Sequence, residues 1–459
     1  MTMTSLQEPH SLEARALEHL WMHSNDLEWD ELVNGGLRVF VEGHGSTLVD
    51  SQGKQYIDGL AGLFVVAAGH GRAEIGEAMA EQAGRLAYTA ASNAANPVNI
   101  ALAEKISSLT PGDLDRVFLC SGGSEAVESA MKIAKQVQVM RGHGKRYKVI
   151  ARRGSYHGTT FGAASLTGSA SEKYFGPFMA GVSKVPNPNH YRNDFGLDGE
   201  AGDIMCARYV EQEILAQGPE NVAAVIGEPI SVANGTHIPN PVYWQMLREI
   251  CDRYGVLLIM DEVITGWGRT GKMFAAEHYG VVPDIMTMAK GLSSGYAPIA
   301  AVAVRSSIFD DFRPRGQALN HLITFGGHAV AAAGALKNIE ILEREGLVER
   351  SAEVGSYLFD LAQQLRSHPT VGDVRGGMGL LCAIDFVKSK ATREAWGTSH
   401  PFIKYLALRT QEEGLVTRVW DVLHLAPPFV LTRSEAERAI EIVDRCLTEA
   451  ESKFGSEIQ

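Results

Sequence analysis

Two stretches of the sequence carry a charged side chain to the end of an apolar, strand-like run. VLLIMDEV (256–263) ends with the acidic pair Asp261 and Glu262, and DIMTMAKG (284–291) ends with Lys290. In an open parallel sheet such ends lie at the edge that presents ligand-binding groups. A lysine in apolar surroundings has a lowered pKa and can act as an amine nucleophile toward an aldehyde. Acids at a strand end can also cap the next turn or form surface ion pairs, and that interpretation stays open.

A carboxylate beside such an amine can keep a pyridine nitrogen protonated, which is what pyridoxal phosphate needs to act as an electron sink. The phosphate of this cofactor would need backbone N–H groups at the start of a helix. CSGGSEAVESAMK (120–132) supplies a strand end, then Gly122, Gly123 and Ser124, then a helix. The same order also describes an ordinary helix start with a serine cap.

An aromatic cover for the cofactor ring is the remaining requirement. GSYHGTT (154–160) offers Tyr156, followed directly by His157, after the apolar run KVIARR. A single tyrosine in such a place is more often part of a core, so Tyr156 gains its meaning only from the combination with the other motifs.

The stretch ITGWGRTGK (264–272) matches two nucleotide-binding patterns at once, G-x-G-x-x-G and G-x-x-x-x-G-K. A phosphate-binding loop requires Ser or Thr after its lysine, and Met273 stands there. The dinucleotide pattern requires a helix at its last glycine, but the segment that follows is short and ends at Pro283. We therefore expect both to be chance matches in a chain with 48 glycines. A dinucleotide-binding oxidoreductase is the alternative from a different class.

The elements around these motifs alternate between short apolar runs and amphipathic stretches, which predicts a mainly parallel sheet with helices on both faces. The predicted strands are RVFLC (116–120), KVIARR (148–153), VAAVIGEPI (222–230), VLLIMDEV (256–263), DIMTMAK (284–290) and IAAVAV (299–304). The predicted helices are residues 124–140, 203–215 and 243–255.

The two ends of the chain have a different pattern. Residues 328–350 are predicted to form one long helix, and a glycine-rich turn, the strand LLCAIDF (380–386) and a final helix after residue 431 follow. We expect residues 1–70 and 329–459 to form a smaller α+β domain against a large domain of residues 71–328.

Composition excludes several classes of function. The net charge of -12 and the pI near 5.7 oppose binding to nucleic acid or anionic lipid. Residues 1–30 have no apolar signal core and no run is long enough to span a membrane, so a cytoplasmic location is expected. The five cysteines are scattered singly, which predicts buried thiols, and no helical histidine pair suggests a catalytic metal.

The motifs together resemble a known family. SGGSEA, YHGTT, GEPI, MDEVITGWGRTG, AKGL and TFGGH occur in the order and approximate spacing of the class III pyridoxal-phosphate aminotransferases, the ω-transaminase group. The resemblance covers about residues 30–450, and the segment DEVxxGxGRTG with a lysine 29 residues after its aspartate is highly specific. It implies fold type I, with a seven-stranded, mainly parallel sheet in the large domain. It also implies that the glycine-rich loop is a structural turn beside the cofactor.

The resemblance assigns roles around the cofactor ring. Lys290 matches the Schiff-base lysine that also shuttles the substrate proton, and Asp261 matches the partner of the pyridine nitrogen. Val263 matches the side chain packed under the ring, and Tyr156, with His157 beside it, matches the residue stacked above. Glu228 in GEPI matches an acid that helps to hold the aspartate and its neighbours.

The resemblance also assigns the phosphate contacts. Gly123 and Ser124 match the phosphate cup, and Gly122 stands where many relatives have Ser, so the cup is expected to lack one side-chain hydrogen bond. Thr324 in TFGGH matches a threonine that reaches the phosphate from a second subunit. A homodimer or homotetramer is therefore expected.

The implied reaction moves an amino group from an amine or ω-amino acid to a keto acid such as pyruvate. Arg418 matches the mobile arginine that pairs with a substrate carboxylate, and Phe64 stands where several amine:pyruvate relatives carry Trp. Aminomutase, racemase and decarboxylase relatives use the same cofactor, and Lys290 and Asp261 do not separate these chemistries. The donor and acceptor are left open by the sequence.

Overall fold

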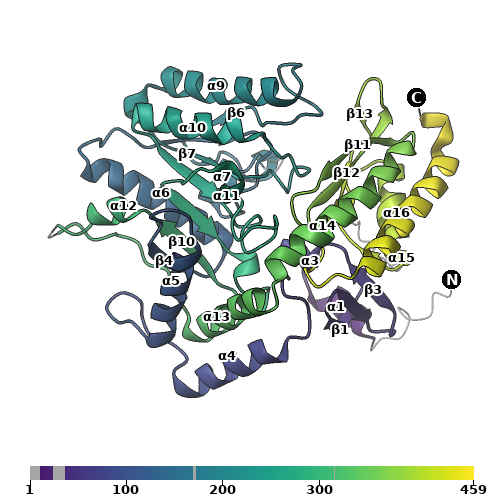
Figure 1. Cartoon of the computed structure of the whole chain (residues 1–459), viewed down its shortest axis with the longest axis horizontal. Helices are drawn as coiled ribbons and strands as arrows, with labels where there is room; N and C mark the ends of the chain where they lie inside the picture. Colours follow the sequence, from purple (N-terminus) through teal and green to yellow (C-terminus); the bar gives the residue numbers. More distant parts are fainter. Residues whose placement is uncertain (1–10, 24–36, 169–171, 315, 459) are drawn as a thin grey trace.

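A computed structural model of the chain describes residues 11–23, 37–168, 172–314 and 316–458. Figure 1 shows a large lobe, drawn mainly in teal, beside a smaller lobe where the purple and yellow ends of the chain meet. Among the described residues the large lobe contains a seven-stranded sheet with the order β4-β10-β9-β8-β7-β5-β6. Its strands are β4 (Arg116–Cys120), β5 (Lys148–Arg152), β6 (Val182–Val185), β7 (Val222–Gly227), β8 (Leu257–Asp261), β9 (Ile285–Met288) and β10 (Ala300–Val304).

The sheet is parallel from β9 through β6, and β10 runs antiparallel to both β9 and β4. Every residue of β7, β8, β9 and β10 is buried, as expected for strands covered on both faces. Side chains alternate between the two faces along β8. Leu257 and Ile259 belong to the cluster of α6 (Gly123–Met140), and Leu258 and Met260 belong to the cluster of α10 (Pro241–Tyr254) on the other face. The mainly parallel seven-stranded sheet that we expected is confirmed.

The helices of the large lobe are α4 (Ala73–Arg85), α5 (Pro97–Leu109), α6 (Gly123–Met140), α7 (Phe161–Leu166), α8 (Glu172–Phe175), α9 (Gly199–Gln217), α10 (Pro241–Tyr254), α11 (Ala276–Tyr279), α12 (Ser306–Asp310) and α13 (Ala329–Arg344). Three of them, α6, α9 and α10, lie where the periodicity predicted helices. The helix α13 packs against α4 and α5 at the bottom of Figure 1.

The smaller lobe is built from both ends of the chain. Strand β3 pairs in parallel with β14, and β12 pairs with β11, β13 and β15. Its elements are α1 (Leu12–His19), β1 (Phe40–His44), β2 (Thr47–Asp50), β3 (Gln55–Asp58), α3 (Ala61–Phe64), α14 (Leu347–Gln363), β11 (Val371–Gly376), β12 (Cys382–Ser389), β13 (Glu394–Ala395), α15 (Pro401–Glu412), β14 (Leu415–Val416), β15 (Val422–Leu425) and α16 (Arg433–Phe454). The exact limits of the domains, 1–70, 71–328 and 329–459, stay a prediction, and residues 1–10 and 24–36 lie outside the described residues.

The prediction of one long helix over residues 328–350 is wrong. Helix α13 ends at Arg344, and α14 begins at Leu347 and continues to Gln363. Gly346 between them has φ of 60°, a left-handed conformation that costs a residue with a side chain about 1 kcal/mol or more. The apolar period continues through this glycine, and the periodicity therefore hides the break. Strand β6 of the large sheet was not among the predicted strands, because its sequence VSKV is half polar.

Candidate functional site

Lys290 lies directly after β9, in a single 3-10 turn formed by Lys290–Leu292. Its φ of 44° is unusual for a residue with a side chain and indicates a conformation that the surroundings enforce. The side-chain amide of Asn338, on α13, donates to the carbonyl oxygens of Gly291 at 2.8 Å and Leu292 at 3.0 Å. A helix far along the chain therefore holds the lysine turn in place.

Asp261 ends β8 and pairs in register with Thr287 on β9, three residues before Lys290. Its buried carboxylate accepts hydrogen bonds from Thr287 Oγ1 at 3.0 Å and from the backbone N–H of Val263 at 3.1 Å. His157 Nδ1 lies 2.6 Å from the same carboxylate and, since a carboxylate only accepts, donates to it. The acid is thus oriented from three sides by groups on separate elements.

His157 is predicted to bind the cofactor, and the structure places it behind Asp261. Its ring is buried, and its Nε2 has no hydrogen-bond partner among the described residues. A buried polar atom without a partner is rare in proteins and often marks a functional site. His157 supports the aspartate in this structure, and the sequence shows it only as the residue after Tyr156.

Burial lowers the pKa of Lys290 to about 8. The Asp261 carboxylate opposes this effect because it favours the charged amine, and the Arg418 guanidinium adds to it. The lysine is therefore largely a neutral amine at mildly alkaline pH, which is the form that attacks a carbonyl carbon.

The predicted phosphate cup lies at the start of α6. Gly122 precedes the helix in an extended conformation, and a side chain added there would meet no atom within 4 Å. A Cβ on Gly123 would lie 3.0 Å from Val263 Cγ1, so the helix start and the residue expected under the ring are in contact. Ser124 Oγ accepts a hydrogen bond from the N–H of Thr159 at 3.1 Å. Free backbone N–H groups at a helix start form an anion site.

Glu228 is joined to Tyr156 by a hydrogen bond and to Arg152 by a buried ion pair. The backbone N–H of Tyr156 donates to Glu228 Oε1 at 3.1 Å, and Arg152 Nη2 lies 3.0 Å from Glu228 Oε2. Arg152 also donates to the carbonyl oxygen of Glu228 and lies 5.6 Å from the Trp244 ring centroid. Sequence reasoning missed Arg152, because KVIARR has two adjacent arginines and nothing in the pattern separates the buried one.

The predicted substrate residues meet around Phe64. This phenylalanine is buried with φ of 59°, and its ring centroid lies 5.9 Å from Lys290 Nζ and 5.4 Å from Arg418 Cζ. Arg418 also lies over the Trp420 ring at 4.2 Å and donates to the carbonyl oxygen of Ala233 at 2.9 Å. A guanidinium and the Lys290 amine thus lie against the same aromatic ring.

Glu262 supports structure and not the reactive amine. Its buried carboxylate accepts hydrogen bonds from Thr265, from the N–H of Ala275 at 3.1 Å and from the N–H of Ala276 at 2.7 Å, at the start of α11. Successive residues of a strand point to opposite faces, so Asp261 and Glu262 diverge. An acid at a strand end could cap the next turn or form a surface ion pair, and Glu262 caps the turn before α11.

The glycine-rich loop, residues 264–272, is packed into the core. Trp267 is fully buried, and a Cβ on Gly271 would lie 2.7 Å from Ala352 on α14. The buried Arg269 donates to the carbonyl oxygens of Leu380 at 3.2 Å and Pro427 at 2.7 Å, both in the smaller lobe. The loop therefore joins the two lobes, and neither of its nucleotide patterns surrounds open space.

Thr324 is exposed, in the segment between α12 and α13. Its carbonyl oxygen accepts a hydrogen bond from Tyr88 Oη at 2.9 Å. Leu322 and Phe325 beside it are each 62% exposed. No hydrogen bond of the described residues joins Thr324 to the site around Lys290, so within one chain this residue stays apart.

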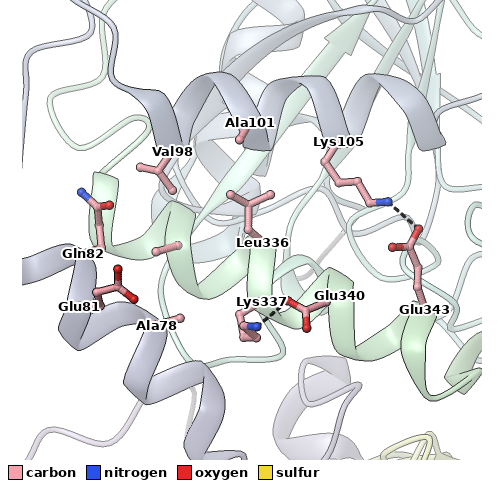
Figure 2. Close-up of a pocket in the computed structure, with 11 residues that line it drawn as sticks. Ala78, Glu81, Gln82, Val98, Ala101, Lys105, Leu336, Lys337, Glu340 and Glu343 are labelled. Atoms are coloured by element: carbon pink, nitrogen blue, oxygen red, sulfur yellow. Dashed lines mark hydrogen bonds and ion pairs between the residues drawn. The ribbon is translucent and has the colours of Figure 1, made fainter.

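A surface groove of about 530 Å³ lies elsewhere, between α4, α5 and α13 (Figure 2). Four of its charged side chains form two ion pairs, Lys105 with Glu343 and Lys337 with Glu340. The residues that line it include none of the predicted site residues.

The described part of the chain contains no group of three or more His, Cys, Asp or Glu residues that could hold a metal ion. None of its helices combines the length and the apolar character needed to cross a membrane. The five cysteines, all within the described residues, are buried and free, as predicted.

A lysine of lowered pKa at one strand end, beside a buried carboxylate at the next, is an arrangement typical of enzymes that use pyridoxal phosphate. The profile of the family described as Aminotransferase class-III matches residues 33–447. A probable aminotransferase of Mycobacterium tuberculosis is 40% identical over 98% of this chain and 97% of its own length. The taurine–pyruvate aminotransferase of Bilophila wadsworthia is 37% identical over 91% of this chain and 93% of its own length.

A solved structure agrees with these sequence relatives. The (S)-enantioselective omega-transaminase of Thermomicrobium roseum superposes with a TM-score of 0.92 at 38% identity, over 96% of this chain and 98% of its own. The chain belongs to the class-III aminotransferase family. It is a pyridoxal-phosphate-dependent aminotransferase, as the motifs predicted.

Proposed function

We propose that the protein transfers an amino group from an amine or ω-amino acid to a keto acid such as pyruvate. The observation that carries this proposal is that Arg418 and Lys290 both lie against the Phe64 ring. A guanidinium there can pair with the carboxylate of a keto acid, and the aromatic walls suit the apolar part of an amine. The taurine–pyruvate aminotransferase among the relatives, named for an amine donor without a carboxylate and for pyruvate, supports it.

The residues around Lys290 fit the cofactor. Gly122, Gly123 and Ser124 would receive its phosphate at the start of α6, and Val263 and Tyr156 would cover the two faces of its ring. When bound, pyridoxal phosphate supplies an aldehyde and a ring that withdraws electrons from the carbon losing its proton. The His157 Nε2, buried without a partner among the described residues, points to a missing polar group nearby.

Each residue of the chain then has a defined task. Asp261, held by His157 and Thr287, keeps a negative charge where the ring nitrogen would lie. The neutral amine of Lys290 takes the proton from the substrate carbon that bears nitrogen and returns it to the carbon that accepts it. Glu228 fixes the backbone at Tyr156, which orients that aromatic ring.

A movement of Arg418 would allow one site to bind both an anionic keto acid and an uncharged amine. A carboxylate buried without a partner is costly, and so is a guanidinium left unpaired beside an apolar amine. Arg418 would contact the keto acid from its present position and turn toward solvent for the amine. Phe64 would contact the substrate in both half-reactions.

The site is proposed to be completed in a homodimer or homotetramer. Thr324 is exposed beside Leu322 and Phe325. It has no hydrogen bond with any of the described site residues. An exposed apolar patch of this kind is typical of a protein interface. A partner subunit would then bring its Thr324 to the phosphate cup. A cytoplasmic location is part of the same proposal.

The test is a substrate panel on the purified holoenzyme. Taurine, putrescine, β-alanine and 1-phenylethylamine are offered as donors, each with pyruvate and with 2-oxoglutarate, and the new amino acid is measured. Formation of alanine with at least one of these amines supports the proposal. Racemisation, decarboxylation or movement of the amino group within one molecule, without a need for a keto acid, would show that the cofactor serves another reaction.

A further inference from the structure

Arg418 and His424 face each other across the turn that leads from β14 into β15. The backbone N–H of His424 donates to the carbonyl oxygen of Arg418 at 3.1 Å, and the N–H of Trp420 donates to the carbonyl oxygen of Val422 at 3.1 Å. Residues paired in this antiparallel way have neighbouring side chains on one face. The register of the turn therefore places the imidazole beside the guanidinium.

A loop of the large lobe receives both side chains. His424 Nε2 lies 3.0 Å from the carbonyl oxygen of Val232, and Arg418 Nη2 lies 2.9 Å from that of Ala233. A carbonyl only accepts, so Nε2 donates its proton to Val232. Arg418 Nη2 lies 3.2 Å from Nε2 and 3.3 Å from Nδ1, and two nearly equal distances of this length place it over the face of the imidazole ring. The Val232 carbonyl thus holds the ring with its face against the guanidinium.

His424 remains neutral in this place. It is 2% exposed, and burial together with the adjacent Arg418 charge holds its pKa well below the ordinary value. A guanidinium can stack on the face of a neutral imidazole, whereas a charged ring would repel it. His424 also meets the Phe64 ring edge to face, with 5.9 Å between ring centroids.

The guanidinium held in this way contacts the same aromatic ring as the lysine. Arg418 Cζ and Lys290 Nζ lie 5.4 Å and 5.9 Å from the Phe64 ring centroid. Arg418 is thus turned inward, toward the ring that Lys290 also contacts, and this is the position suited to a keto acid.

We propose, on the basis of the proposed function, that His424 is a positioning residue that holds Arg418 inward and so sets the preference between anionic and uncharged substrates. A keto acid needs the inward guanidinium, and an uncharged amine needs it removed. Loss of the imidazole therefore weakens recognition of pyruvate and eases binding of 1-phenylethylamine. A residue that only supports the fold would weaken both.

The test measures KM and kcat of the holoenzyme for pyruvate and for 1-phenylethylamine. His424→Val is expected to raise the KM for pyruvate about fivefold to tenfold, as for loss of one contact between a guanidinium and an aromatic face. The KM for 1-phenylethylamine is expected to fall. His424→Phe keeps an aromatic face for Arg418 and is expected to retain most of the affinity for pyruvate. His424→Gln can donate to Val232 without offering an aromatic face, and it should behave like the valine variant.

A double-mutant cycle separates this inference from the proposed function. Arg418→Ala is expected to raise the KM for pyruvate more than His424→Val, and His424→Val added to it should cause no further rise. Additive effects of the two changes, or equal losses for both substrates, would overturn the role of His424 and leave that of Arg418 intact. No effect of Arg418→Ala on pyruvate would overturn the proposed recognition of the keto acid, and the role of His424 with it.

Discussion

The reactivity of Lys290 in the cofactor-free protein offers a direct test of the site. Burial lowers the pKa of this amine from 10.5 to about 8. At pH 8 about half of the Lys290 amines are then neutral, compared with roughly 0.3% for a lysine of ordinary pKa. The advantage in reactive amine is therefore on the order of a hundredfold at that pH.

The same shift predicts how stability depends on pH. Between pH 8 and pH 10.5 the unfolded chain retains the Lys290 proton and the folded chain has released it. Lys290 therefore makes the cofactor-free protein less stable below pH 8, and its penalty disappears as the pH rises through that window.

The assay is brief acetylation across the pH range, followed by mass spectrometry of the Lys290 peptide. The exposed Lys272 serves as the internal reference, and Lys290→Ala removes the signal. Arg418→Ala should move the midpoint upward, because a positive neighbour is lost, and Asp261→Asn should move it downward. A midpoint in the unmodified protein near that of an exposed lysine would refute the reasoning, as would shifts of opposite sign.

Three further predictions concern other parts of the site. Asp261→Asn keeps contacts with His157 but loses the negative charge. Turnover, measured as the steady-state rate, should therefore fall roughly 10²- to 10³-fold, while absorbance should show that some cofactor remains bound. Normal turnover would remove Asp261 from the mechanism. Arg152→Ala leaves the buried Glu228 charge unpaired and should cost about 3–5 kcal/mol in the free energy of unfolding by urea. Its control, Arg153→Ala, breaks an exposed pair and should cost less than about 1 kcal/mol, and equal losses would contradict the argument. Thr324→Ala should weaken cofactor retention without lowering stability, and sedimentation of an active monomer would count against the shared site.

The edge of the sheet that carries Asp261 and Lys290 could largely be predicted from the sequence, because it depends on local patterns. Asp261 and Lys290 stand at the ends of apolar runs, and the rule that parallel strands end at one edge brings them together. The same local reasoning placed Gly122 and Gly123 at a helix start. The prediction of a single helix was wrong at Gly346, because the spacing of the apolar residues does not change where the backbone turns.

The arrangement of the predicted substrate residues was decided by tertiary structure. Phe64, Ala233 and Arg418 are far apart in the chain, and they meet because β3 and β14 pair and bring both chain ends to the large lobe. The resemblance named Phe64 and Arg418 but did not reveal His424, whose neighbours come from a separate loop. Local sequence determines which strands and helices form and which side chains stand at their ends. Contacts between distant segments decide which of these side chains are buried, paired or held beside Lys290, because burial and charge depend on neighbours that the order of residues does not show.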